Sequence, residues 1–313
     1  MALHPTIAQF IASMPAPPPG PLNPVAMREG EESQVPPVEK RLLVHSVSDK
    51  SIPTSFGDIP VRIYKPTAAG SHPVVVYFHG GAFFLGSLNT HDHIARALTD
   101  AAQCVVVSVD YRRAPEHAFP AGLNDCYAVV EWIAKNGRDP NSGIGWNGQS
   151  FAVAGDSSGG NLAAAVAAMA LDAGLKSITH QILYYPSLDL DFDVERYESL
   201  KTNAVGNGLE TALLKPFNAF YINSGADPAD PLVSPIKRED LSGLPPALIV
   251  TAECDPLRDE AEQYGRNLIL AGVPATIRRY QSAGHGFVQH FSWLPEFQGV
   301  FAETADFLKS AQR

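Results

Sequence analysis

Residues 155–160 of this 313-residue chain read Gly155-Asp156-Ser157-Ser158-Gly159-Gly160. An apolar run at residues 151–154 precedes this stretch, and an alanine-rich run at residues 161–173 follows it. The pattern Gly-x-Ser-x-Gly between a strand and a helix is typical of a nucleophile elbow, a sharp turn with the serine at its tip. Glycine two residues before and after the serine removes Cβ atoms that would collide at such a turn. Ser157 has this spacing, whereas Ser158 has an aspartate two residues before it.

The chain around this stretch alternates strand-like and helix-like segments. Continuous apolar runs, typical of strands buried on both faces, occupy residues 74–78, 104–109, 151–154, 182–185 and 247–251. A more polar run at residues 276–280 resembles an edge strand. Helix-like stretches separate these runs at residues 91–101, 124–136, 161–173 and 259–271. The alternation predicts an α/β fold with a mainly parallel sheet covered by helices.

Two regions lie outside this alternation. Residues 41–47 and 58–64 alternate apolar and polar side chains around a turn at residues 57–58, which predicts an antiparallel pair of strands. Residues 192–225 contain helix-like pieces and no strong strand run, which is more typical of a cap than of core. Apolar side chains in this insertion either line a substrate pocket or pack the cap onto the body, and periodicity leaves both open. They include Leu213, Leu214, Phe217, Phe220 and Tyr221.

Charge and composition exclude several classes of protein. The formal net charge is −10 and no run of Lys and Arg is present, which argues against binding to nucleic acid. No segment approaches the ~20 apolar residues of a membrane span. The first residues lack the basic flank of a signal peptide. Because Cys104 and Cys254 belong to apolar runs and the cysteine count of 3 is odd, we expect buried free thiols in a soluble, cytoplasmic protein.

A serine nucleophile requires a histidine that accepts its proton and a carboxylate that orients the histidine. When the serine lies on an elbow, the acid and then the histidine follow it along the chain. His285 lies between two glycines after the last strand-like run, and His290 is more typical of a surface histidine. We therefore predict that His285 is the general base for Ser157.

The acid is predicted at the end of the run at residues 247–251. Asp255 precedes a proline and is therefore kept out of a helix, on the loop that follows the strand. Asp259 and Glu260 instead suit the first turn of the next helix, where acidic side chains are favoured. We predict Asp255 as the acid of the triad, with Glu253 as the alternative.

The oxyanion that forms during attack on a carbonyl requires preorganised N–H groups. One donor is the amide of the residue after the nucleophile, here Ser158. The strand-like run at residues 74–78 leads directly into His79-Gly80-Gly81, whose glycines let the backbone approach a substrate. We expect the amides of Gly80 and Gly81 to be the other donors. His79 precedes the serine and is expected to orient this loop by hydrogen bonding.

The sequence gives no support for a metal or a cofactor. The segment His91-Asp92-His93 contains ligand-type residues. A spacing of two residues on a helix, however, points the two imidazole rings apart. The metalloprotease pattern His-Glu-x-x-His is absent from the sequence.

Several motifs together resemble the hormone-sensitive-lipase-like carboxylesterases, an α/β-hydrolase family. That family has His-Gly-Gly-Gly, Gly-Asp-Ser-Ala-Gly-Gly, Asp-Pro-Leu and His-Gly-Phe, in this order. The matching segments here are residues 79–82, 155–160, 255–257 and 285–287, and the resemblance extends over roughly residues 40–310. Two residues depart from the pattern: Ala82 replaces the third glycine, and Ser158 replaces alanine.

The resemblance implies an α/β-hydrolase fold with about eight strands, flanking helices and a helical cap. The cap would comprise residues 1–40 and 188–225, and the core residues 41–187 and 226–313. The implied activity is hydrolysis of short- to medium-chain carboxylic esters through an acyl-enzyme. Because the exposed edge of the strand at residues 276–280 could pair with a second chain, a monomer and a homodimer both stay open. A related lipase, amidase or lactonase is the alternative, followed by a non-catalytic receptor. The residues expected to line the substrate pocket are Phe83, Phe84, Leu209, Leu213 and Phe217.

Overall fold

The structure, a computed structural model, describes residues 2–14, 20–67 and 70–310. An eight-stranded sheet with the order β1-β2-β4-β3-β5-β6-β7-β8 forms its centre. The strands are β1 Ser46–Thr54, β2 Gly57–Lys65, β3 His72–Phe78, β4 Val105–Val109, β5 Trp146–Asp156, β6 His180–Tyr184, β7 Ala247–Cys254 and β8 Ala275–Gly284. β2 pairs antiparallel with β1 and β4, whereas the pairs from β4 to β8 are parallel. The predicted α/β-hydrolase fold with a mostly parallel sheet is confirmed.

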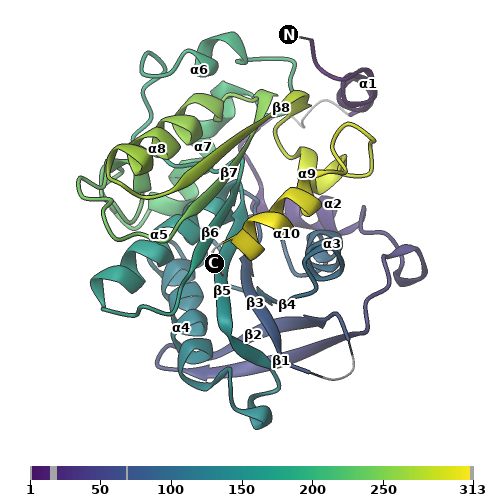
Figure 1. Ribbon diagram of the computed structural model, residues 1–313. Coiled ribbons are helices and arrows are strands. Elements are labelled where there is room, and N and C mark those ends of the chain that lie inside the picture. Colours follow the sequence, from purple (N-terminus) through teal and green to yellow (C-terminus); the bar gives the residue numbers. More distant parts are fainter. Residues whose placement is uncertain (1, 15–19, 68–69, 311–313) are drawn as a thin grey trace.

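The helices cover both faces of this sheet (Figure 1). They are α1 Pro5–Ser13, α2 Pro24–Glu32, α3 Asp92–Ala102, α4 Ala121–Asn136, α5 Ser158–Asp172, α6 Ser199–Thr202, α7 Thr211–Ile222, α8 Arg258–Leu270, α9 Phe287–His290 and α10 Val300–Ser310, with short 3-10 helices at Val38–Lys40, Pro140–Ser142 and Pro235–Lys237. Helices α4, α5 and α8 lie on one face of the sheet, and α3 and α10 lie on the other. Within the described residues, none of the helices combines the length and hydropathy needed to cross a bilayer.

The alternation of side chains along β3 shows how this sheet is buried on both faces. Val74, Val76 and Phe78 belong to the hydrophobic cluster beneath α4, α5 and α8. Val75 and Tyr77 belong to the cluster beneath α3 and α10. All five side chains are inaccessible to solvent. Successive strand residues point to opposite faces, so a strand covered on both sides must be apolar throughout.

The first hairpin differs from its prediction. The strand predicted at residues 41–47 lies instead at 46–54, and Thr54 pairs with Gly57 across the turn. β1 is an edge strand with only Ile52 fully buried. Because β1 is mostly polar, its apolar and polar residues alternate only weakly, and the pattern did not reveal the bounds of the strand. The predicted edge position of residues 276–280 agrees with the structure, where β8 is the last strand of the sheet.

Parallel strands bring the candidate residues together at one end of the sheet. β3, β5, β7 and β8 run in the same direction, so their carboxyl ends meet at one edge. The segments with His79, Ser157, Asp255 and His285 follow these ends. Ligands bind at this edge in open α/β sheets.

Candidate active site

Ser157 lies on a sharp turn that requires glycine two residues before it and two residues after it. β5 ends at Asp156, α5 begins at Ser158, and Ser157 between them has φ 54° and ψ −119°. A Cβ at Gly155 would lie 2.2 Å from the carbonyl oxygen of Gly159. A Cβ at Gly159 would lie 2.0 Å from the carbonyl oxygen of Phe78. Both distances are far below van der Waals contact, so the close approach of helix, turn and strand excludes alanine at either position.

The histidine and the acid predicted from chain order lie beside this serine. The Nε2 atom of His285 lies 2.9 Å from Ser157 Oγ, and its Nδ1 atom lies 2.8 Å from Asp255 Oδ2. Asp255 is fully buried, and its other carboxylate oxygen accepts the amide of Leu257 at 2.9 Å. The ring of Tyr185 packs edge-on against His285 at 4.9 Å between centroids. The imidazole is therefore held in one orientation between the hydroxyl and the carboxylate.

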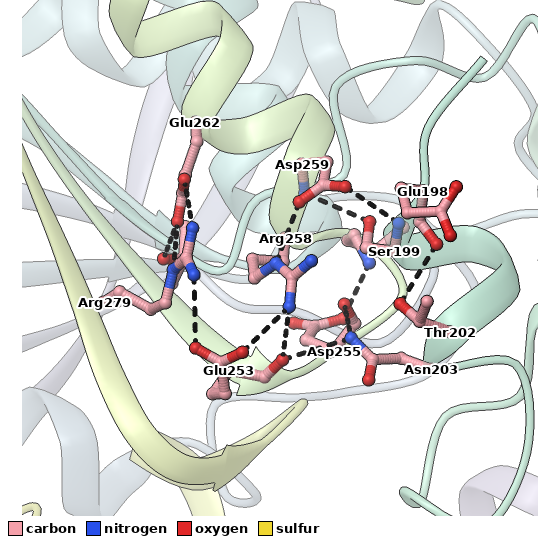
Figure 2. A network of polar contacts seen from close by, with 12 residues as sticks. Glu198, Ser199, Thr202, Asn203, Glu253, Asp255, Arg258, Asp259, Glu262 and Arg279 are labelled. Carbon is pink, nitrogen blue, oxygen red and sulfur yellow. Dashed lines mark hydrogen bonds and ion pairs between the residues drawn. The ribbon is translucent and has the colours of Figure 1, made fainter. Parts of the chain in front are cut away.

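Helix α6 supports the loop that contains Asp255 (Figure 2). Asn203, just after α6, donates from Nδ2 to the carbonyl oxygens of Asp255 and Glu253 at 3.0 and 3.1 Å. Ser199 donates from Oγ to the carbonyl oxygen of Pro256 at 2.7 Å. These bonds connect the insertion after β6 to the backbone on both sides of the buried acid.

The competing acidic residues point to other partners. Glu253 forms ion pairs with Arg258 at 3.1 Å and Arg279 at 3.2 Å (Figure 2). Asp259 accepts the amide of Ser199, and Glu260 accepts the amide of Leu188. Of the four acids considered, Asp255 is the one that contacts His285. His290 lies exposed at the end of α9, on the rim of the pocket.

In the loop after β3, the predicted oxyanion donors differ from the structure by one residue. The amide of Gly80 donates to Asp156 Oδ1 at 2.8 Å, so it is not available to a substrate. Gly81 and Ala82 line the pocket beside Ser157 and Ser158, whereas Gly80 does not. Among the described residues, no hydrogen bond engages the amides of Gly81, Ala82 or Ser158. The sequence could not reveal this shift by one residue, because it depends on how Asp156 on β5 faces the end of β3.

His79 is buried beneath this loop. Its Nδ1 atom lies 2.8 Å from the carbonyl oxygen of Gly80, and its ring stacks on Tyr111 at 4.3 Å between centroids. Tyr111 also donates to the carbonyl oxygen of His79 at 2.7 Å. Burial lowers the pKa of His79 to about 3. These contacts fit a neutral imidazole that orients the loop.

Asp156 is the centre of a buried polar network under the same loop. Its carboxylate accepts the hydroxyl of Tyr77 at 2.5 Å and the amide of Gly80, and it lies 3.4 Å from His91 Nε2. Burial opposes ionisation of Asp156, but the charge of His91, with the hydrogen bonds from Tyr77 and Gly80, lowers the pKa of this carboxylate to about 2. Burial likewise opposes protonation of His91, but the Asp156 carboxylate raises the pKa of that imidazole. The two residues therefore form a buried ion pair.

His91 and Asp92, the first two ligand-type residues of the segment at residues 91–93, have partners within the protein. His91 pairs with Asp156, and Asp92 accepts hydrogen bonds from Tyr64 and Arg96. Within the part of the chain that the structure describes, no group of three or more His, Cys, Asp or Glu side chains could hold a metal ion.

A cavity of about 420 Å³ opens onto Ser157 and His285. Four of the five residues predicted to line the pocket do so: Phe83, Leu209, Leu213 and Phe217. The fifth, Phe84, is fully buried and packs instead on Phe217 and Phe220 of α7, at 5.3 and 4.7 Å between ring centroids.

Residues 1–40 were predicted to belong to the cap, but none of their side chains was predicted to line this cavity. Ile7, Phe10 and Ile11 of α1 line it, as does Met27 of α2. The helical spacing of the three α1 residues was the available signal, because an apolar stripe on a helix must cover another surface. Which surface it covers is set by tertiary structure.

The sequence of this chain is similar to those of known esterases. A family profile described as alpha/beta hydrolase fold matches residues 75–289. The chain is 42% identical over 243 residues to the carboxylesterase NlhH of Mycobacterium tuberculosis, which covers 76% of this chain and 74% of that protein. It is 38% identical over 246 residues to an arylesterase of Saccharolobus solfataricus, with 78% of each chain covered.

Solved structures show the same likeness. An esterase of Pyrobaculum calidifontis superimposes with a TM-score of 0.90 at 39% sequence identity, covering 99% of both chains. A thermostable esterase of Pseudomonas putida superimposes with a TM-score of 0.90 at 32% identity, covering 100% of this chain and 98% of that one.

Proposed function

Since this chain belongs to the hormone-sensitive-lipase-like family of α/β hydrolases and is a carboxylic ester hydrolase, we propose that Ser157, His285 and Asp255 are its catalytic triad. One observation carries the proposal: His285 is bonded on one side to Ser157 at 2.9 Å and on the other to Asp255 at 2.8 Å. This is the geometry in which a histidine can accept the serine proton while a buried carboxylate stabilises the imidazolium.

The reaction proceeds through an acyl-enzyme. His285 Nε2 accepts the proton as Ser157 Oγ attacks the ester carbonyl, and the same proton then passes to the departing alcohol. Water, deprotonated by His285, attacks the acyl-serine, and His285 then returns this proton to Ser157 Oγ as the carboxylic acid is released. Asp255 remains ionised throughout and holds the imidazole by its Nδ1–H.

We propose the amides of Gly81, Ala82 and Ser158 as the oxyanion donors. The support is their position along the pocket next to Ser157, with no other hydrogen bond engaging them among the described residues. Ala82 replaces Gly80 in this role, because the Gly80 amide bonds to Asp156. A preorganised donor of this kind typically contributes about 10²–10³ in kcat.

We propose that the described part of residues 1–40, namely residues 2–14 and 20–40, and residues 188–225 form a cap over the acyl site, which selects short- to medium-chain esters. Helices α1 and α2 from the first segment and α7 from the second supply apolar side chains to the cavity. Its volume of about 420 Å³ lies toward the low end of ligand sites. The cap thus limits the length of chain that fits.

The experiment is a series of p-nitrophenyl esters of increasing acyl length, assayed on the wild type and on Ser157→Ala. The proposal expects a maximum of kcat/KM among the short to medium chains and a loss of about 10⁴–10⁶ in kcat in the variant. A maximum at long chains would overturn the acyl preference and favour a lipase. Near-normal turnover by Ser157→Ala would overturn the triad.

We further propose a reducing, cytoplasmic compartment and a monomer or homodimer. Cys104 and Cys126 are buried thiols, which fits a protein kept reduced. β8 lies at one edge of the sheet, and a second chain could pair there. Cell fractionation tests the compartment, and light scattering coupled to size exclusion tests the assembly.

A further inference from the structure

The loop at residues 81–86, called the oxyanion loop below, adopts a backbone that its own sequence does not favour. Ala82 has φ 50° and Phe83 has φ 67°, and neither is glycine. Consecutive non-glycine residues in the left-handed region are strained. Such strain persists only where surrounding contacts fix the conformation. The loop therefore requires anchors outside itself.

The inner side of the loop is anchored to the body of the protein. The amide of Phe83 donates to Ser158 Oγ at 3.1 Å, and the carbonyl oxygen of Phe83 accepts the amide of Ala114 at 3.0 Å. The ring of Phe83 stacks on Tyr221 of α7 at 3.8 Å between centroids. These contacts fix Phe83 but leave the peptide groups of the next residues to other partners.

Helix α2 holds the outer side of the loop through Arg28. Its Nε atom donates to the carbonyl oxygen of Phe84 at 2.6 Å, and Nη2 donates to the carbonyl oxygen of Ala114 at 2.6 Å. Both terminal nitrogens also donate to Glu116, at 2.8 and 2.7 Å. Three residues further along α2, Glu31 accepts the amide of Gly86 at 2.8 Å.

The Arg28 guanidinium is well suited to this task. It is planar and permanently charged, so it binds the two carbonyl oxygens and the carboxylate in one fixed fork. The side chain is 18% exposed, which limits competition from water. The hydrogen bond from Arg28 also lowers the pKa of Glu116 to about 2, so the partner stays ionised. Arg28 itself does not line the cavity at Ser157.

We propose that Arg28 is a positioning residue that holds the amides of Gly81 and Ala82 where the oxyanion develops. The inference rests on the proposed oxyanion role of this loop. It makes α2, a part of the N-terminal segment, contribute to the rate of the chemical step as well as to the shape of the pocket. Loss of the clamp would allow the loop to relax, and small displacements of donors are costly in rate.

The test compares Arg28→Ala and Arg28→Lys with Arg238→Ala. Arg238 is a matched control because it also combines a carboxylate fork, to Asp172, with a bond from Nε to a carbonyl oxygen, that of Asp240. For Arg28→Ala we expect kcat to fall about 10–100-fold with KM within about threefold. Arg28→Lys should be intermediate, and Arg238→Ala should match the wild type.

Chemical rescue separates positioning from folding. Millimolar guanidinium chloride should restore much of the kcat of Arg28→Ala, because it can fill the vacated site between the two carbonyls and Glu116. Tetramethylammonium chloride at equal ionic strength should not. A trifluoromethyl ketone, which forms a hemiketal with the serine, should lose affinity for Arg28→Ala in proportion to kcat/KM. If Arg28 had only a structural role, the variant would have a lower melting temperature, but its loss of affinity for the ketone would not follow its loss of kcat/KM.

The outcomes are distinct. Normal kcat in both Arg28 variants, or a loss that only tracks unfolding and that guanidinium does not reverse, would overturn the inference. If Arg28→Ala fails to fold, Arg28→Lys with the ketone series decides alone. Activity in Ser157→Ala would instead show that the proposed triad had failed, whatever Arg28 does.

Discussion

Ser158 Oγ accepts a hydrogen bond from the backbone amide of Phe83 at 3.1 Å. The bond joins the first residue of α5 to the oxyanion loop, and both partners are buried. It gives a structural reason for Ser158, at the position where the Gly-Asp-Ser-Ala-Gly-Gly motif that this chain resembles has alanine. The side chain of Ser158 fixes the loop, while its backbone amide is a proposed oxyanion donor.

Replacement of Ser158 by alanine is therefore expected to slow the enzyme moderately. The substitution keeps the amide of residue 158 but leaves the buried Phe83 amide without its acceptor, which costs about 1–3 kcal/mol. We expect kcat to fall by about 3–30-fold if part of that cost is expressed in the transition state. Steady-state kinetics on a p-nitrophenyl ester provides the measurement. An unchanged kcat together with an unchanged melting temperature would show that the bond has no role.

The identity of the triad acid is tested by two matched variants, each of which replaces one carboxylate with the corresponding side-chain amide. Asp255→Asn should reduce kcat by about 10⁴, because the amide no longer stabilises the required tautomer and the imidazolium. Glu253→Gln, two residues earlier, should keep kcat within about threefold, since Glu253 contacts Arg258 and Arg279 and not His285. Comparable losses in the two variants would contradict the assignment.

The buried pair of His91 and Asp156 makes a pH-dependent contribution to the free energy of unfolding. Because the fold raises the pKa of His91, the stabilisation from its charge is full below its unfolded value of about 6.5 and is lost as the pH rises through the folded value. Because the fold lowers the pKa of Asp156 to about 2, its contribution is present above about pH 3.9 and is lost as the pH falls through the folded value.

The measurement is urea unfolding of the wild type and His91→Asn at about pH 6 and about pH 9. The destabilisation caused by His91→Asn should be larger at the lower pH. His45→Asn is the control, since His45 is exposed at the surface. An equal destabilisation at both pH values would argue against a charged His91 in the folded protein.

Two phenylalanines of α7 allow the effect of lining the cavity to be distinguished from the effect of packing against Phe84. Phe217 lines the cavity and also contacts Phe84, whereas Phe220 contacts Phe84 but does not line the cavity. Phe217→Ala should enlarge the acyl site and move the maximum of kcat/KM to longer p-nitrophenyl esters. Phe220→Ala should leave that maximum in place. It should lower the free energy of unfolding by less than the about 3–5 kcal/mol typical of a buried Phe→Ala change, since Phe220 is only partly buried. A shift of the maximum in both variants would mean that packing of Phe84 sets the preference.

Local sequence rules predicted the residues that meet at the elbow. The glycines at 155 and 159 are required by close backbone contacts at the elbow, and the order of serine, acid and histidine is the one typical of folds with such an elbow. The same rules fixed the expected burial of the strand at residues 74–78. For the two glycines and for this strand, the information lies within a few residues of the position concerned.

The features that sequence could not supply depend on contacts between distant segments. Gly80 was expected to be an oxyanion donor, but a carboxylate 76 residues away occupies its amide. Phe84 was expected in the pocket, but α7 covers it. Arg28 lies 56 residues from the loop that it holds. Local propensity and periodicity cannot predict such pairings, which form only when segments distant in the sequence meet in the fold.

The nucleophile can be identified by the site of covalent modification. The enzyme is inactivated with a small organophosphonate ester that mimics an acylating substrate, digested, and mapped by tandem mass spectrometry. We expect one adduct for each inactivated chain, on Ser157, with no adduct in Ser157→Ala and with the adduct still on Ser157 in Ser158→Ala. Complete inactivation with the adduct on Ser158, or on a residue outside residues 155–160, would contradict it.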